Sequence, residues 1–289
     1  MLTSEEENYI LSNAYVPEHS VGLITSLSDG VPYLIDDYFC CRKEYWLIVI
    51  GYPLQKNFTA EGFEAFINSL TKRFQPKLLS VIAPVLSPAF SATCKERERD
   101  FYYTMDPQLP LIRGSVKRNL RKSALVLTVE RSRNMDDGHQ ELIQEFRDRV
   151  RPSVQVENLL YKMPHFVQQN DQSLVLNARD SNHKLTAFYV VDLAPKNFAN
   201  YIIGCHSKKN YVLGASDLLL FELIKLSKEC RKSYIHLGLG VNDGVRRFKE
   251  KWGGKPTHRY EMCELVLKKH SFLSAVLSMQ KKLMHFRCY

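Results

Sequence analysis

The order of helices and strands in the second half of the chain most constrains its fold. Residues 136–150 predict an amphipathic helix, because Leu142, Ile143 and Phe146 recur at helical spacing on one face. In chain order the predictions are a strand at 125–130, helices at 136–150 and 156–168, strands at 173–178, 185–193 and 201–205, a helix at 216–231, a strand at 234–239, a helix at 243–252 and a strand at 258–267. This alternation predicts an α/β fold in which helices flank a sheet.

The first half of the chain repeats the end of that order. Its predicted elements are a strand at 45–52, a helix that Thr59 can cap, a strand at 78–84, a short helix at 87–95 and a strand at 100–105. No residue-level repeat accompanies this likeness of pattern. Since a domain usually has about 100–200 residues, the 289 residues predict two domains or one large one.

The charge of the chain bears on its partners. The formal net charge is +9. This balance favours an anionic partner, such as a nucleotide, a phosphorylated cofactor, RNA or an anionic membrane surface. A solvated, lysine-rich surface explains the charge equally well.

The cysteines and the apolar segments bear on location. The seven cysteines are scattered and form no C-x-x-C pair. Their spacing predicts neither a metal site nor a disulfide framework, and it points to a reducing compartment. The acidic N-terminus lacks a signal-peptide pattern, and no apolar run approaches the ~20 residues that span a bilayer. We expect a soluble, cytoplasmic protein without metal or transmembrane segment.

Three segments carry a resemblance to a known family. The first comprises GASDLL at 214–219 and YIHLG at 234–238. The second, GVRRFKEKWGG at 244–254, resembles a signature of glycine, F-K, an aromatic residue and glycine. The third is DFYYTM at 100–105, followed by the basic helix predicted at 113–122 with RNLRK at 118–122. Together they resemble the Fem-like proteins of the GNAT superfamily, which include peptidoglycan aminoacyltransferases.

This resemblance implies a fold and an activity. It implies tandem GNAT-like domains, each a mixed, mostly antiparallel sheet flanked by helices, with splayed central strands. Residues 1–109 would form the N-terminal half, and residues 110–289 the C-terminal half with the catalytic machinery. The implied activity is the transfer of an acyl or aminoacyl group to an amine. The acyl carbonyl would lie between the strands at 201–205 and 234–239.

The donor's phosphates would bind at the start of the helix at 216–231, because a helix N-terminus offers free N–H groups and a positive dipole end. The residues that we expect there are Lys208, Lys209, Tyr211, Gly214, Ala215 and Ser216. The alternative is a simple helix cap, with Ser216 as the N-cap. The usual acyl-CoA signature has a Gln or Arg that this loop lacks, so the nature of the donor stays open.

Lys249 is the first catalytic candidate, because it matches the family lysine and could stabilise an anionic intermediate or bind a phosphate. It could also belong to the solvated side of a basic helix. His236 flanks the expected gap and could act as a base, although a structural histidine is the other reading. Arg118, Arg121 and Arg247 could bind the substrate or could simply be solvated.

Three functions are consistent with these features. The leading one is an N-acyltransferase that uses acyl-CoA, or acyl carrier protein, and a small-molecule or peptide amine as acceptor. The second is an aminoacyl-tRNA-dependent transferase, disfavoured because the chain lacks the heptad pattern of a long RNA-binding coiled coil. The third is a non-catalytic module that binds a nucleotide or RNA.

Overall fold

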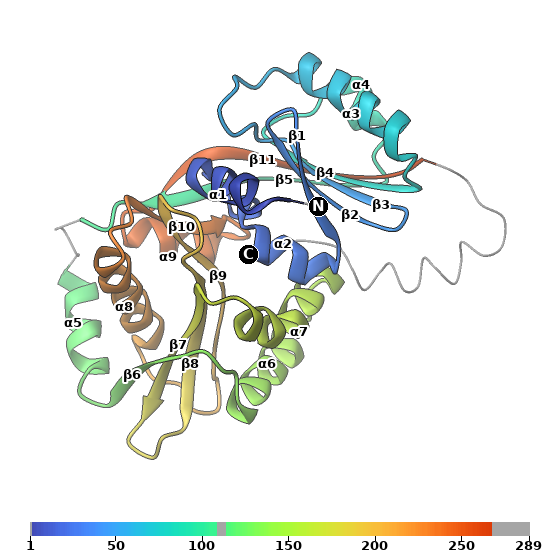
Figure 1. Ribbon diagram of the computed structural model, residues 1–289. Coiled ribbons are helices and arrows are strands. Elements are labelled where there is room, and N and C mark those ends of the chain that lie inside the picture. The colour runs from blue at the N-terminus through green and yellow to red at the C-terminus, as the bar shows by residue number, and fades with distance from the viewer. Residues whose placement is uncertain (1, 109–113, 268–289) are drawn as a thin grey trace.

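The computed structural model describes residues 2–108 and 114–267. The sequence also predicts a basic amphipathic helix at 271–286, which lies outside the described residues. Its centre is an 11-stranded mixed sheet with the order β1-β2-β3-β4-β11-β5-β10-β9-β8-β7-β6 (Figure 1). The strands are β1 Val31–Ile35, β2 Tyr38–Lys43, β3 Trp46–Ile50, β4 Leu78–Ala83, β5 Glu96–Met105, β6 Leu127–Ser132, β7 Ser173–Asp180, β8 Leu185–Asp192, β9 Phe198–His206, β10 Tyr234–Leu239 and β11 Lys255–Val266.

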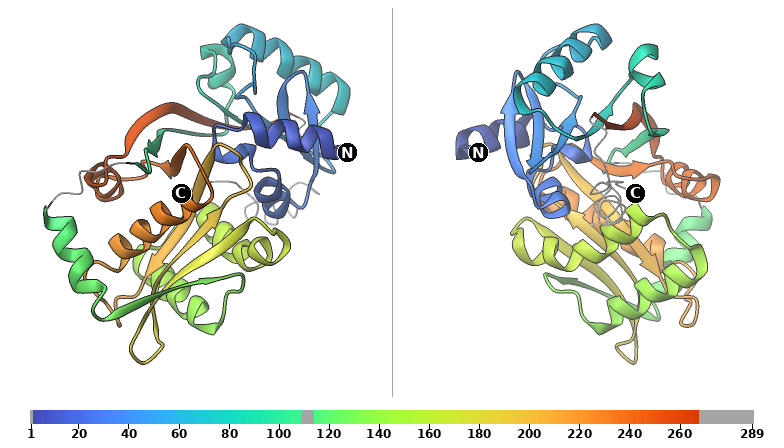
Figure 2. Two further views of the ribbon diagram at one scale, coloured as in Figure 1. Left: turned by 60° about the vertical axis from the view of Figure 1, so that its left-hand side comes forward. Right: turned by 90° about the vertical axis from the view of Figure 1, so that its right-hand side faces the viewer.

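Helices cover both faces of this sheet (Figures 1 and 2). On one face lie α1 Ser4–Asn13, α2 Val21–Ser28, α6 Asp137–Val150 and α7 Val154–Gln169. On the other lie α3 Ala60–Phe74, α4 Pro88–Ala92, α5 Gly114–Ser123, α8 Ala215–Glu229 and α9 Asp243–Lys251. A short 3-10 helix, Pro17–His19, joins α1 to α2.

Two sets of strands repeat one pattern of connections. β3 and β4 are parallel and joined through α3, and β9 and β10 are parallel and joined through α8. Antiparallel strands precede each parallel pair. At the middle of the sheet, β5 pairs with β10, β11 pairs with β4, and β5 pairs with β11. Each set is therefore completed by a strand from the other half of the chain.

The apolar cores differ between the two faces. One continuous core underlies α1, α2, α6 and α7. The opposite face has two cores, one under α3 and one under α8. Between these two, the face of β5 and β11 opens to solvent, and Phe101 is 46% exposed.

The predicted α/β fold is confirmed. The helices and strands predicted between residues 45 and 267 are all present, with their ends shifted by a few residues. Thr59 is the N-cap of α3 as predicted, and its side chain accepts a hydrogen bond from the Gly62 amide. The first 44 residues, for which no elements were predicted, form α1, α2, β1 and β2.

The expectation that no disulfide forms is wrong. Cys94 and Cys263 are 169 residues apart in sequence, yet they form a disulfide with their Cα atoms 5.5 Å apart. The sheet brings them together because β11, which carries Cys263, inserts between β4 and β5. Sequence spacing contains no sign of that insertion. The other described cysteines are free: Cys40, Cys41, Cys205 and Cys230.

Within residues 2–108 and 114–267, none of the helices has the length and apolar character that a bilayer crossing requires.

Candidate functional site

The parallel strands β9 and β10 separate soon after they begin. They pair only at the first three residues of each, Phe198 to Asn200 against Tyr234 to His236. The corresponding strands β3 and β4 stay paired over five residues each. The splay predicted between the central strands is thus present in the second set, while the first set stays closed.

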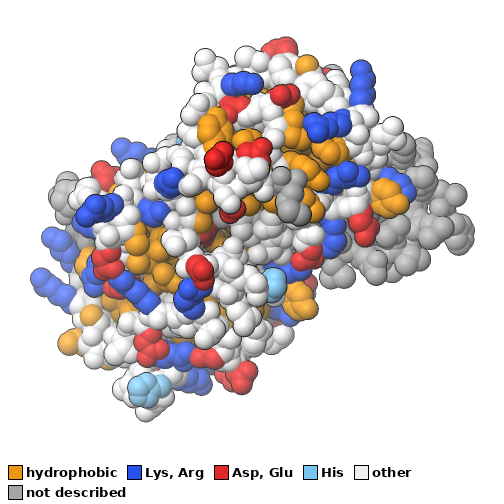
Figure 3. Space-filling model, viewed as in Figure 1, with side chains coloured by type: hydrophobic (Ala, Val, Ile, Leu, Met, Phe, Trp, Pro, Cys, Tyr) orange, Lys and Arg blue, Asp and Glu red, His pale blue; other side chains and the backbone are white. Residues whose placement is uncertain are grey.

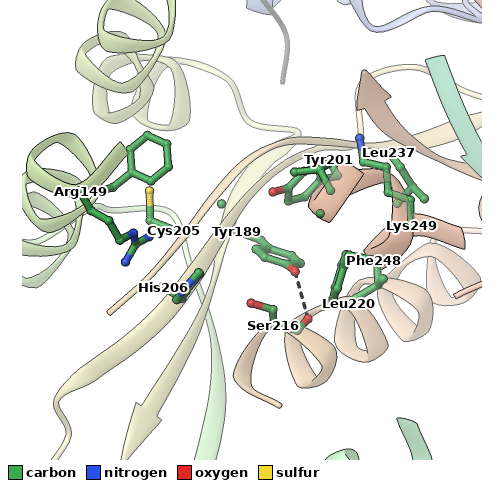
Figure 4. Close-up of a pocket in the computed structure, with 14 residues that line it drawn as sticks. Arg149, Tyr189, Tyr201, Cys205, His206, Ser216, Leu220, Leu237, Phe248 and Lys249 are labelled. Carbon is green, nitrogen blue, oxygen red and sulfur yellow. Dashed lines mark hydrogen bonds between the residues drawn. The ribbon is translucent and has the colours of Figure 1, made fainter. Parts of the chain in front are cut away.

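A cavity of about 320 Å³ occupies the opening between β9 and β10. Its lining is mostly apolar or aromatic and includes Tyr189, Tyr201, Leu237 and Phe248. In Figure 4, Arg149 lies at one end of this cavity and Lys249 at the other, with Tyr189 between them. Because the lining comes from helices on both faces of the sheet, the cavity passes through the opening. Its size falls in the range of sites that hold small molecules, about 300–1,000 Å³.

Two tyrosines shape the middle of this cavity. The rings of Tyr189 and Tyr201 meet edge to face with their centroids 4.7 Å apart. Gly204 leaves room for them, since a Cβ atom there would lie 2.4 Å from the Tyr189 ring. The Tyr189 hydroxyl donates a hydrogen bond of 3.0 Å to the Ser216 carbonyl. The cavity is therefore tied to the first turn of α8.

Lys249 brings a titratable amine into this apolar setting. Its side chain is buried, only 3% of the residue is exposed, and its Nζ donates a hydrogen bond to the Leu239 carbonyl. The Nζ lies 5.7 Å from the centroid of the Tyr103 ring. Burial lowers the pKa of Lys249 to about 7, although the carboxylate of Asp100 acts in the opposite direction. Near neutral pH, Lys249 can therefore exchange a proton, as a general acid or base must.

A second cavity, of about 240 Å³, lies at the start of α8. His206, Ser216 and Phe248 line both cavities, so the two are neighbours. Gly214 is the N-cap of α8, with a φ of 88° and no side-chain cap hydrogen bond. The alternative in which Ser216 caps the helix is therefore wrong. An uncapped helix start favours an anion, because N–H groups of its first turn lack intrahelical partners.

Four of the six residues expected to bind the donor line this second cavity: Tyr211, Gly214, Ala215 and Ser216. Lys208 and Lys209 do not. Their backbone N–H groups donate to the Glu145 carboxylate over 2.9 and 3.4 Å, which fixes the loop before α8.

A buried carboxylate holds the neighbouring helices in place. Asp217, in the first turn of α8, accepts hydrogen bonds from Trp252 Nε1 at 2.8 Å and from Asn119 Nδ2 at 3.3 Å. Its other contact is an ion pair of 2.6 Å with Lys251. These bonds join α8 to α5 and to the end of α9. Trp252 is thus a core residue.

His236 is also buried, but its surroundings differ from those of Lys249. Its ring packs against Tyr102 and Phe198, with centroid distances of 5.1 and 5.5 Å. The following residue, Leu237, lines the first cavity, so the alternation of side chains along a strand turns His236 to the other face. Burial, together with Lys249 and His258, holds the pKa of His236 far below its usual value. Its neutral imidazole is consistent with a structural role.

The arginines proposed as substrate ligands lie on the surface. Arg118 and Arg121 on α5 and Arg247 on α9 are exposed, and none of them lines either cavity. Figure 3 shows Lys and Arg side chains spread over the visible face of the molecule with Asp and Glu among them. The substrate role of these three arginines stays a prediction.

Sequence reasoning missed the aromatic lining of the first cavity. Phe146, Tyr189 and Tyr201 belong to amphipathic or apolar segments and could not be told from core residues. Gly204 was the available signal, because a glycine inside a strand often marks a close approach.

Residues 2–108 and 114–267 contain no group of three or more His, Cys, Asp or Glu side chains placed to hold a metal ion.

No protein-family model matches the chain, and no curated protein matches it. Solved structures do. FemX matches with a TM-score of 0.60 and 9% identity, covering 90% of this chain and 96% of its own. The C-terminal domain of a putative lysylphosphatidylglycerol synthetase from Agrobacterium fabrum matches with a TM-score of 0.56 and 15% identity, covering 97% and 96%. L-PGS from Bacillus licheniformis matches with a TM-score of 0.53 and 15% identity, covering 99% and 98%. At these identities the likeness shows the fold, and the fold expected from the resemblance to Fem-like proteins is confirmed.

Proposed function

We propose that this chain is a transferase that moves an acyl group from an activated donor to an amine. One observation carries the proposal. Strands β9 and β10 pair over only three residues each, which leaves an opening between them. The cavity in this opening is lined by Lys249 and adjoins the start of α8, where no side chain caps the helix. A reacting carbonyl would lie in the opening, and the phosphate of the donor would lie at the start of α8.

The opening suits the carbonyl for a simple reason. Beyond Asn200 and His236, the facing edges of β9 and β10 no longer pair with each other. Backbone N–H groups on such an edge can donate to the oxyanion that forms when the amine attacks. The mostly apolar lining lowers the local dielectric constant, which strengthens those hydrogen bonds.

Lys249 would act as the general base that accepts the proton of the attacking amine. The acceptor nitrogen forms a bond to the acyl carbon, the bond from that carbon to the donor breaks, and its electron pair leaves with the donor. The attacking amine must lose one proton, and the neutral amine form of Lys249 can accept it. Since its pKa is lowered to about 7, the transfer rate should rise with pH through about 7 and then level off. A transfer rate that falls as the pH rises through about 7 would instead show that the protonated form of Lys249 is the active one.

The donor best suited to the site is acyl-CoA, or the acyl-phosphopantetheine of acyl carrier protein. Its arm would run through the opening and its phosphate would lie at Gly214 and Ser216. A second candidate is an aminoacylated tRNA, as in Fem-type enzymes. It is favoured by the likeness to FemX and to a lysylphosphatidylglycerol synthetase, and by the exposed basic helix α5, which Asn119 holds beside α8. The amine acceptor would be a small molecule or a peptide.

Mass spectrometry of the small molecules and RNA released from freshly purified, denatured protein tests the donor. A CoA or acyl-pantetheine species supports the first candidate, and aminoacylated tRNA supports the second. The rate of acyl transfer by wild-type protein and by Lys249→Met is then measured with the donor that was found. If no donor co-purifies, both acyl-CoA and aminoacylated tRNA are used. Transfer that Lys249→Met abolishes supports the proposal. Wild-type protein that transfers from neither class would contradict it and favour a non-catalytic binding module.

A further inference from the structure

A groove of about 740 Å³ lies across the middle of the sheet, away from both cavities described above. Its floor includes Phe101 and Tyr103 from β5 and Arg259 from β11. It occupies the solvent-exposed strip between the core under α3 and the core under α8. Arg246 from α9 and Arg99 from β5 also line it. The groove therefore combines an exposed aromatic ring with three guanidinium groups.

The acidic side chains of this groove do not match its positive charge. The carboxylate of Glu261 serves two guanidinium groups, those of Arg99 at 3.0 Å and Arg97 at 3.1 Å. Arg259 lies directly across from Phe101 in the register of β5 and β11. Its side chain is exposed and has no ion pair within the described part of the chain. One guanidinium group is thus free to bind a ligand.

Asp100 is held mainly by backbone N–H groups. Its carboxylate accepts hydrogen bonds of 2.7 Å from the backbone N–H groups of Phe101 and Val241. Arg246 lies 3.8 Å from it, at the outer limit of an ion pair, and its other partner, Asp243, is at the surface. The Arg246 guanidinium group therefore keeps donors for an incoming anion.

The groove and Lys249 are separated by a single aromatic ring. Tyr103 lines the groove, and the same ring lies 5.7 Å from Lys249 Nζ. Arg246 precedes Lys249 by three residues on α9, which places their Cα atoms about 4.5 Å apart along the helix axis. A molecule anchored by Arg246 and Arg259 would thus lie on the opposite side of the Tyr103 ring from Lys249.

We infer that this groove binds the acceptor, and that the acceptor carries a carboxylate or phosphate group near its amine. The inference rests on the proposed transferase function and names the class of its second substrate. A guanidinium group binds either anion through paired hydrogen bonds. The exposed face of Phe101 offers an apolar contact to the body of the acceptor.

Isothermal titration of the full-length protein with three small amines tests this inference. O-Phosphoethanolamine and β-alanine carry a phosphate and a carboxylate, and ethanolamine carries neither. We expect at least one of the two anionic amines to bind and ethanolamine not to, and their order distinguishes phosphate from carboxylate. Arg259→Gln should weaken the binding roughly tenfold, as for the loss of a charge-assisted hydrogen bond. Lys72→Gln, at an exposed position on α3, removes the same charge and should have no effect.

A parallel titration with acetyl-CoA separates this inference from the proposed function. If acetyl-CoA binds equally to wild type and to Arg259→Gln while anionic amines discriminate between them, both conclusions stand. If the two anionic amines bind no better than ethanolamine, or bind Arg259→Gln as well as wild type, the acceptor inference fails whatever the donor does. If the anionic amines bind through Arg259 but the protein transfers no acyl group, the groove is an anion-binding site, and its role in acyl transfer is rejected.

Discussion

Protonating a lysine side chain that is buried beside aromatic rings costs free energy, and Lys249 is such a residue. In the unfolded chain its pKa would be about 10.4, whereas burial lowers it to about 7 in the folded protein. Between these two values the unfolded state binds more protons than the folded state, so this group makes the free energy of unfolding rise with pH. Below pH 7 the full cost of the buried cation is present. Retaining such a residue is consistent with a functional role rather than with stability.

Lys249→Met should therefore abolish transfer and stabilise the protein at low pH. Removing the cation recovers on the order of 3–5 kcal/mol, and leaving the Leu239 carbonyl without its donor costs about 1–3 kcal/mol. We expect a net gain of roughly 2 kcal/mol at pH 6, shrinking as the pH rises toward 10. Urea denaturation across this pH range measures it, with the exposed Lys72→Met as control. A variant less stable than wild type at pH 6 would show that Lys249 supports the fold.

At the scale of elements, the start of α8 depends on one glycine. Gly214 has a φ of 88°, and a Cβ atom there would lie 2.9 Å from the Asn119 carbonyl oxygen of α5. A β-branched residue would meet both a strained backbone and a backbone atom that cannot move easily. The second cavity therefore depends on Gly214 for its shape.

Gly214→Val should weaken donor binding at least tenfold and lower the free energy of unfolding by about 2 kcal/mol. Calorimetric titration with acetyl-CoA and urea denaturation measure the two effects. Gly114→Ala is the matched control, since a Cβ atom there meets nothing within 4 Å. It should bind acetyl-CoA as wild type does. Donor affinity that survives Gly214→Val would move the donor site away from α8.

Most elements could be predicted from the sequence because their signals are local. The helical stripe of α3 with its Thr59 cap, and the apolar run of β10, need no tertiary information. The α1 helix was missed because it is polar, although Thr3 and Glu6 form a capping box that could have indicated it. The cavity lining and the groove over β5 could not be predicted, because the exchange of β5 and β11 brings together residues far apart in sequence. The motif made Lys249 a catalytic candidate, which stays a prediction, whereas its burial and lowered pKa depend on packing.

At the scale of the whole molecule, a disulfide joins segments from the two halves of the chain. Cys94 follows α4, and Cys263 lies in β11. Closing so long a loop restricts the unfolded chain, which typically contributes about 2–4 kcal/mol. The Cys94→Ser/Cys263→Ser double variant should be less stable than the oxidised wild type by this amount in urea denaturation. Reductant should lower the wild type to the same level. Cys230→Ser, at an exposed free thiol, is the control, and a wild type unaffected by reductant would contradict the prediction.

Strand β5 of the first half pairs with β10 of the second half, and β11 of the second half pairs with β4 of the first. From this exchange of strands we predict how the two halves of the chain behave when separated. A cut after residue 109 would leave β5 with the first fragment and β11 with the second, although β5 pairs with β10 and β11 pairs with β4. Each fragment alone would expose unpaired strand edges and part of a core, so fragments 1–109 and 110–289 should be unfolded or aggregated when expressed separately. Expressed together, they should associate into one folded complex, because the sheet needs no covalent link at residue 109. Circular dichroism and size-exclusion chromatography of the separate and combined fragments measure this. A fragment that folds alone and cooperatively would show that its core does not need the exchanged strand.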